Sequence, residues 1–107
     1  MSTPRHVCVM TTCPNAEEAG RLADALVQQR LAACVQTHAV DSTYRWQGVV
    51  EHSAEVRLLI KARLADLAAI DALVKATVSY ENPELVALPV VAGSRFYLDW
   101  IDAQTQR

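Results

Sequence analysis

The 107-residue chain has no cluster of lysine or arginine and no long apolar run. With a formal net charge of −2, it lacks the basic surface that nucleic acids require. The first residues, MSTPRHVCVMTT, lack the apolar segment of a secretory signal, and no stretch approaches the roughly 20 apolar residues that span a bilayer. We therefore expect a cytoplasmic protein that binds neither nucleic acid nor membranes.

Cysteine is also scarce. Cys8, Cys13 and Cys34 are an odd number and form no C-x-x-C pair, which argues against a disulfide framework or a zinc site. We expect reduced thiols that pack as small hydrophobic groups. Because a helix N-terminus lowers a thiol pKa, Cys13, just before a helix expected from Asn15, is the best candidate for oxidation or adventitious metal capture.

Hydrophobic periodicity predicts four strands and three helices. The strands are expected at 6–12, in a segment ending near residue 46, at 49–62 and at 85–91; the helices start near 15, run from about 64 to 78, and span 95–104. Asn15 and Glu18 have the spacing of a capping box, and Gln47-Gly48 predicts a hairpin turn. The last strand is apolar enough for burial on both faces, but Pro89 favours an edge position.

This order predicts an α+β fold, a ferredoxin-like βαββαβ sandwich with a long hairpin and a short C-terminal helix. Three features of this fold are difficult to satisfy within a single chain. The 49–62 strand would span roughly 40 Å, so the hairpin must bend sharply or protrude. An apolar edge strand invites pairing with another chain, and two helices cover only one face of the sheet. A symmetric oligomer would solve these problems and bury Tyr44 and Trp46; the alternative is a twisted hairpin folded over its own sheet.

Five stretches carry a resemblance to a known family: RLAACVQ (30–36), STYRWQGVVE (42–51), LLIKA (58–62), YENPELVALPV (80–90) and YLDWI (97–101). In order and spacing they resemble the CutA family of divalent-cation tolerance proteins. The resemblance implies one ferredoxin-like domain over residues 1–107, assembled as a homotrimer with Trp46 at a seam between subunits. It also implies a role with copper or other divalent metal ions, or in signalling, and no catalytic reaction.

The metal site of some relatives does not carry over. They place a cysteine at the position of Thr11 and histidines at those of Thr77 and Val78. Cys34, which matches the family's A-A-C cysteine, remains a candidate copper ligand, with a packed thiol as the alternative. Two further candidate sets of donors come from the residues themselves: His6, Cys8 and Met10 on one strand face, and His38 with His52 on adjacent strands. The alternation of His6, Cys8 and Met10 is also that of an ordinary buried strand face. For His38 and His52, the sequence does not fix the register of the two strands.

A polar ligand pocket is the other candidate site. Glu81 and Glu84 flank a proline turn beside Tyr80, and Lys61 is their natural counter-charge. The resemblance places these residues near a cleft between subunits, where we also expect Trp46. The alternative is a turn held by a salt bridge. Tyr97 and Trp100 are either aromatic walls of the pocket or core residues.

These observations leave two main functions open. One is a cytosolic trimeric protein of the divalent-cation tolerance type that binds metal or signals; the other is a small-molecule sensor with a pocket between subunits, for which metal is incidental. A structural trimer that anchors another protein also stays open. An enzyme such as an acylphosphatase is disfavoured, because TTCPNAEEAG (11–20) offers neither a glycine-rich phosphate loop nor a basic cradle. No obligatory cofactor is expected.

Overall fold

Four strands and three helices follow one another in the computed structural model, which describes residues 3–107. The strands are β1 (His6–Cys13), β2 (Cys34–Trp46), β3 (Val49–Arg63) and β4 (Val86–Pro89). The helices are α1 (Ala16–Gln28), α2 (Leu67–Thr77) and α3 (Arg95–Gln104). Every helix within the described residues is too short or too polar to cross a bilayer. The predicted βαββαβ order with a C-terminal helix is confirmed.

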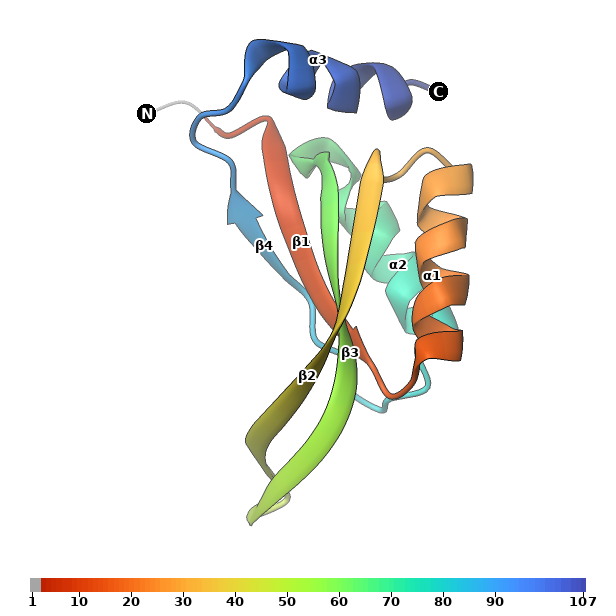
Figure 1. The fold of residues 1–107 in the computed structure, drawn as a ribbon, viewed down its shortest axis with the longest axis vertical. Coiled ribbons are helices and arrows are strands. Elements are labelled where there is room, and N and C mark those ends of the chain that lie inside the picture. The colour runs from red at the N-terminus through yellow and green to blue at the C-terminus, as the bar shows by residue number, and fades with distance from the viewer. Residues whose placement is uncertain (1–2) are drawn as a thin grey trace.

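The strands form one sheet in the order β2-β3-β1-β4, and each neighbouring pair is antiparallel. Helices α1 and α2 pack together beside the sheet, while α3 lies across one end of it (Figure 1). The core between the sheet and the two helices is mainly apolar; its largest members include Val9, Leu22, Leu58, Ile60 and Ile70, all 0 % exposed. This arrangement is the ferredoxin-like α+β fold.

The side chains that alternate with this core point to the other face of the sheet and remain partly uncovered. Cys8, Met10 and Leu59 are half-buried, whereas Val86 and Leu88 on β4 are 44 % and 50 % exposed. β4 is the edge strand that Pro89 predicted, but the expectation that both of its faces are buried is wrong for the single chain. The edge therefore presents apolar side chains.

The β2–β3 hairpin protrudes beyond the helices (Figure 1). Its turn has positive φ at both Gln47 (51°) and Gly48 (82°), the geometry that matches the twist of the flanking strands. Beyond the ends of the helices, the core-facing side of β3 has no layer to pack against. Val50 is therefore 52 % exposed, although it lies on the same face of the strand as the buried Ile60. The expected protrusion is confirmed, and the folded-back alternative is not observed.

Several predicted boundaries and faces differ from the structure. The expected 64–78 helix begins with a 3₁₀ turn, Leu64–Asp66, before α2, and the expected 85–91 strand is shortened to β4. The apolar side chains of Val27 on α1 and Phe96 on α3 are 44 % and 86 % exposed. Helical periodicity alone did not show where each helix stops contacting the sheet.

Candidate functional site

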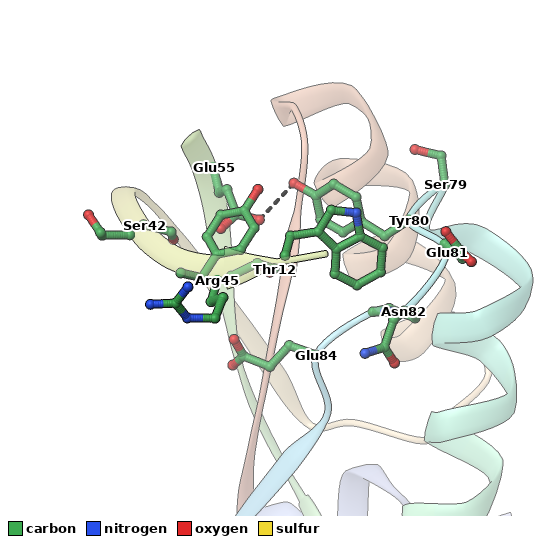
Figure 2. A pocket seen from close by; sticks show the side chains of 13 residues that line it. Thr12, Ser42, Arg45, Glu55, Ser79, Tyr80, Glu81, Asn82 and Glu84 are labelled. Atoms are coloured by element: carbon green, nitrogen blue, oxygen red, sulfur yellow. Dashed lines mark hydrogen bonds between the residues drawn. The ribbon is translucent and has the colours of Figure 1, made fainter. Parts of the chain in front are cut away.

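A pocket of about 800 Å³ opens where the β2–β3 hairpin leaves the body of the fold. Its walls come from three segments far apart in the chain: the end of β1, the hairpin, and residues 79–84 after α2 (Figure 2). The hairpin contributes Tyr44, Arg45, Trp46 and Glu55, and the 79–84 segment contributes two more glutamates. The protruding hairpin thus forms one wall of the pocket.

Glu55 and Tyr80 link two of these walls. The Tyr80 hydroxyl donates a hydrogen bond of 2.7 Å to Glu55 Oε2, drawn in Figure 2. Burial alone would raise the pKa of Glu55, but hydrogen bonds from Ser42, Tyr80 and Thr12 outweigh burial and lower it. Burial, followed by the Glu55 hydrogen bond and charge, raises the pKa of Tyr80. At neutral pH the pair is a carboxylate held by a neutral phenol.

Glu18 tethers the 79–84 segment to α1. Its carboxylate accepts hydrogen bonds from the backbone N–H of Ser79 at 2.7 Å and from the Ser79 hydroxyl at 2.8 Å. Only half of the expected capping box is present: Asn15 Oδ1 accepts the bond from the Glu18 N–H at 2.9 Å, but the Glu18 side chain faces Ser79 instead of returning to Asn15. The capping-box spacing correctly predicted the start of the helix, but it did not predict this long-range contact.

Thr11 supports the same segment from the other side. It is fully buried, and its hydroxyl donates a hydrogen bond of 2.6 Å to the backbone carbonyl of Glu84. Thr11 therefore makes a structural contact here.

Four of the five predicted pocket residues come together. Trp46, Tyr80, Glu81 and Glu84 all line the pocket. Lys61 does not; its ammonium group donates to Gln36 Oε1 at 3.3 Å and lies 5.8 Å from the centre of the Tyr97 ring. Within one chain Lys61 does not reach the two glutamates, because β3 carries it towards α3; its place in a cleft between subunits stays a prediction.

The aromatic residues of α3 lie outside the pocket as well. Tyr97 and Trp100 contact each other, with ring centres 5.5 Å apart, and are 41 % and 40 % exposed. They are neither pocket walls nor core in the single chain.

Sequence reasoning missed Glu55, which lies at the junction of the pocket walls. The alternation of β3 marked it only as one of several polar residues on one face of the strand. Its partner Tyr80 is 25 residues away, and no periodicity links the two. A glutamate in the middle of an alternating strand was the available signal.

In the described part of one chain, the candidate metal donors are not gathered into a metal site. Within residues 3–107 no group of three or more His, Cys, Asp or Glu side chains is arranged to hold a metal ion. The imidazole of His6 contacts Asp102 at 2.9 Å. His38 lies opposite Arg57 and His52 opposite Thr43, so the proposed histidine pair is wrong. Cys34 is half-buried and lies opposite Lys61.

The expected reactivity of Cys13 is also wrong. Its side chain is 0 % exposed. Burial raises the pKa of the Cys13 thiol to about 11, with smaller contributions from the charges of Glu18 and Glu55. Any effect of the nearby helix N-terminus is outweighed, so the thiol stays protonated at neutral pH.

Cys13 should therefore resist alkylation until the protein unfolds. Raising the thiol pKa from 9.0 to about 11 lowers its thiolate fraction near pH 8 about 100-fold, before steric protection is counted. We expect iodoacetamide to label Cys13 at least that much more slowly in native protein than in 8 M urea, measured by peptide mass spectrometry. Similar rates in the two states would contradict the burial of this thiol.

The fold and this site define a small ferredoxin-like protein with a polar pocket at the base of a protruding hairpin. The chain belongs to the CutA1 divalent ion tolerance family, whose family model matches residues 7–104. The structure describes residues 3–107 and therefore covers the whole of this matched region.

Comparisons with individual relatives agree with this family assignment. The divalent-cation tolerance protein CutA of Thermus thermophilus is 44 % identical over 98 residues, covering 91 % of this chain and 95 % of its own length. The chloroplastic CutA of Arabidopsis thaliana is 39 % identical over 101 residues, covering 94 % of this chain. This chain spans 56 % of that plant protein and 60 % of the chloroplastic CutA 1 of Oryza sativa.

Solved structures match the whole fold. The periplasmic divalent cation tolerance protein CutA from Archaeoglobus fulgidus superposes with a TM-score of 0.93 at 36 % identity, covering 94 % of this chain and 99 % of its own. CutA1 from Shewanella sp. SIB1 gives 0.92 at 42 % identity, covering 96 % and 97 %.

Proposed function

We propose that the chain is a homotrimeric, non-enzymatic protein of the divalent-cation tolerance type, folded as one domain over residues 1–107, which binds a small ligand and signals its presence. The carrying observation is the pocket under the hairpin, where Glu55, Glu81 and Glu84 meet the aromatic side chains of Tyr44 and Trp46. Pockets with a few convergent polar groups beside apolar walls are typical ligand sites.

The distribution of apolar surface supports the trimer. Tyr44 and Trp46 near the hairpin tip are 42 % and 39 % exposed, and the edge strand β4 presents Val86 and Leu88. Grouped exposed apolar residues mark interaction surfaces, and a closed symmetric ring would cover both the hairpin and the edge. The pocket would then lie beside a subunit boundary, where occupancy can alter the contact.

The composition of the pocket supports binding rather than catalysis. Within the described chain its lining holds no histidine, cysteine or lysine. Glu55 is engaged by hydroxyl donors, and Cys13 nearby is buried and protonated. A general base or an activated nucleophile would need a group poised to exchange a proton near neutral pH.

Native mass spectrometry combined with a thermal-shift screen tests this function. We expect a mass of three chains and a rise in melting temperature with a ligand that occupies the pocket, because a ligand that binds only the folded state stabilises it. Monomeric protein would overturn the assembly. A metabolite screen without any shift would overturn the ligand function.

Metal binding at Cys34 is the second candidate, and the family description favours it. One chain does not supply a set of metal ligands within residues 3–107, so a copper ion would need donors from more than one subunit. Copper added during native mass spectrometry should then bind once per trimer or in steps of three, and Cys34→Ser should abolish its uptake. Absence of copper adducts would leave the pocket ligand as the function.

We also propose a cytoplasmic location, supported by three free cysteines. The relatives occupy more than one compartment by name, since the Arabidopsis protein is chloroplastic and the Archaeoglobus structure is described as periplasmic. Fractionation of cells that express the native gene tests the location.

A further inference from the structure

We propose that the pocket takes a small organic cation with two or more amino groups, such as an aliphatic diamine or polyamine. This inference rests on the proposed ligand-binding function and adds the chemical class of the ligand. Three properties of the pocket carry it: the balance of charge, the spacing of the carboxylates, and the aromatic walls.

The charge of the pocket is unbalanced. Three carboxylates, those of Glu55, Glu81 and Glu84, line it together with a single guanidinium group, that of Arg45. Arg45 is directed at the turn, where its Nη1 donates to the Gly48 carbonyl at 3.4 Å. Among the ion pairs within residues 3–107, none involves any of the three glutamates. The pocket therefore attracts a ligand with more than one positive charge.

Glu55 is the deepest of these carboxylates. It is half-buried, whereas Glu81 and Glu84 are exposed at the mouth of the pocket. Its hydrogen-bond donors, Tyr80 among them, are hydroxyl groups that carry no charge. Such donors orient the carboxylate and leave its negative charge for a ligand. An ammonium group that reaches Glu55 would form a charge-assisted hydrogen bond in partial shelter from water.

The spacing of the carboxylates separates an organic cation from a metal ion. A compact divalent metal needs several ligand oxygens within about 2.0–2.6 Å of one point. The three glutamates line a common cavity, yet no group of three acidic, histidine or cysteine side chains in the described chain is close enough for such a site. An extended cation can place one amino group at Glu55 and another near the mouth.

The aromatic walls suit the rest of such a ligand. Tyr44 and Trp46 line the same pocket and are 42 % and 39 % exposed. Methylene chains bury apolar surface against aromatic rings, and ammonium groups are attracted to ring faces. The pocket thus offers one half-buried and two exposed carboxylates together with aromatic surface.

Isothermal titration calorimetry on the assembled protein tests the proposal with 1,4-diaminobutane and spermidine as probes. The matched control is 1,4-butanediol, which has the same length and no charge. We expect both amines to bind and the diol to bind at least tenfold more weakly or not at all. Amine binding should also weaken as salt rises from 20 to 300 mM, because screening reduces the attraction between partly exposed charges.

Variants locate the binding. Glu55→Gln should lower the affinity for spermidine about tenfold, and Glu84→Gln, whose side chain is exposed, should lower it about threefold without a risk to folding. Asp24→Asn, on the exposed face of α1 outside the pocket, is the charge-matched control and should have no effect. Equal effects of Asp24→Asn and Glu84→Gln would show that the amines bind only through general attraction to an acidic protein, and this result would overturn the proposal.

The remaining outcomes separate the two levels of inference. If the amines do not bind but a neutral or anionic compound binds and is lost in Glu55→Gln, the cation class is wrong and the ligand function stands. If Mg²⁺ or Cu²⁺ binds through the same glutamates more tightly than spermidine, the pocket is a metal site. If no compound binds in the pocket, both the class and the proposed function fail.

Discussion

Leu88→Asp is expected to convert the proposed trimer into folded monomers. Leu88 is 50 % exposed on the edge strand β4, opposite Cys8, on the sheet face that the core does not use. Burying a leucine at a subunit contact contributes about 2 kcal/mol, and a carboxylate at the same place must give up its hydration. Threefold symmetry repeats this change in every subunit, so native mass spectrometry should show mainly single chains.

Val27→Asp is the matched control for this substitution. Val27 is 44 % exposed on α1, close to the exposure of Leu88, but belongs to the helical layer. Its substitution should leave the trimer intact. Circular dichroism should show that the Leu88→Asp chain keeps its secondary structure, since Leu88 is outside the buried core. A trimeric Leu88→Asp protein, or equal dissociation of both variants, would place the subunit contact elsewhere.

The elements of the fold could be predicted because each depends on local pattern. The hairpin turn follows from Gln47-Gly48, and the edge position of β4 follows from Pro89, which cannot donate to a sheet ladder. The exposure of individual side chains was less predictable. Val50 continues the alternation that buries Ile60, but only the inner part of β3 lies under the helices. Periodicity gives the face of a residue, and the neighbouring elements decide whether that face is covered.

Apart from Trp46, which the resemblance supplied, the site was predictable only where its residues adjoin in sequence. Tyr80, Glu81 and Glu84 could be recognised together because they flank one proline turn. The contact of Tyr80 with Glu55 joins residues 25 positions apart, and that of the neighbouring Ser79 with Glu18 joins residues 61 positions apart. Lys61 was assigned to the glutamates on charge and on the resemblance, whereas in the single chain the sheet places its ammonium group near Tyr97. The predicted reactivity of Cys13 was wrong for a related reason. Its position before a helix was correct, but burial has the larger effect on its pKa.

Glu18→Ala should lower the free energy of unfolding by roughly 2 to 3 kcal/mol, which corresponds to about 10 °C in melting temperature for a domain of this size. Glu18 is 8 % exposed and accepts two hydrogen bonds from Ser79. Its removal leaves the Ser79 N–H without its acceptor and frees the segment that carries Tyr80 to Glu84. Urea unfolding measures the loss, and ligand affinity should fall in the same variant.

Glu17→Ala is an unusually close control for Glu18→Ala, because both glutamates lie in the first turn of α1 and interact alike with the helix dipole. Glu17 pairs with Arg21 at 2.7 Å, but its side chain is 83 % exposed, so its loss should cost no more than about 0.5 kcal/mol. Ser79→Ala removes only the hydroxyl bond and should cost about 1 kcal/mol. In the double variant Glu18→Ala/Ser79→Ala the costs should be less than additive, because the hydroxyl has already lost its acceptor. Strict additivity, or equal effects of the two glutamates, would show that Glu18 does not hold the pocket segment in place.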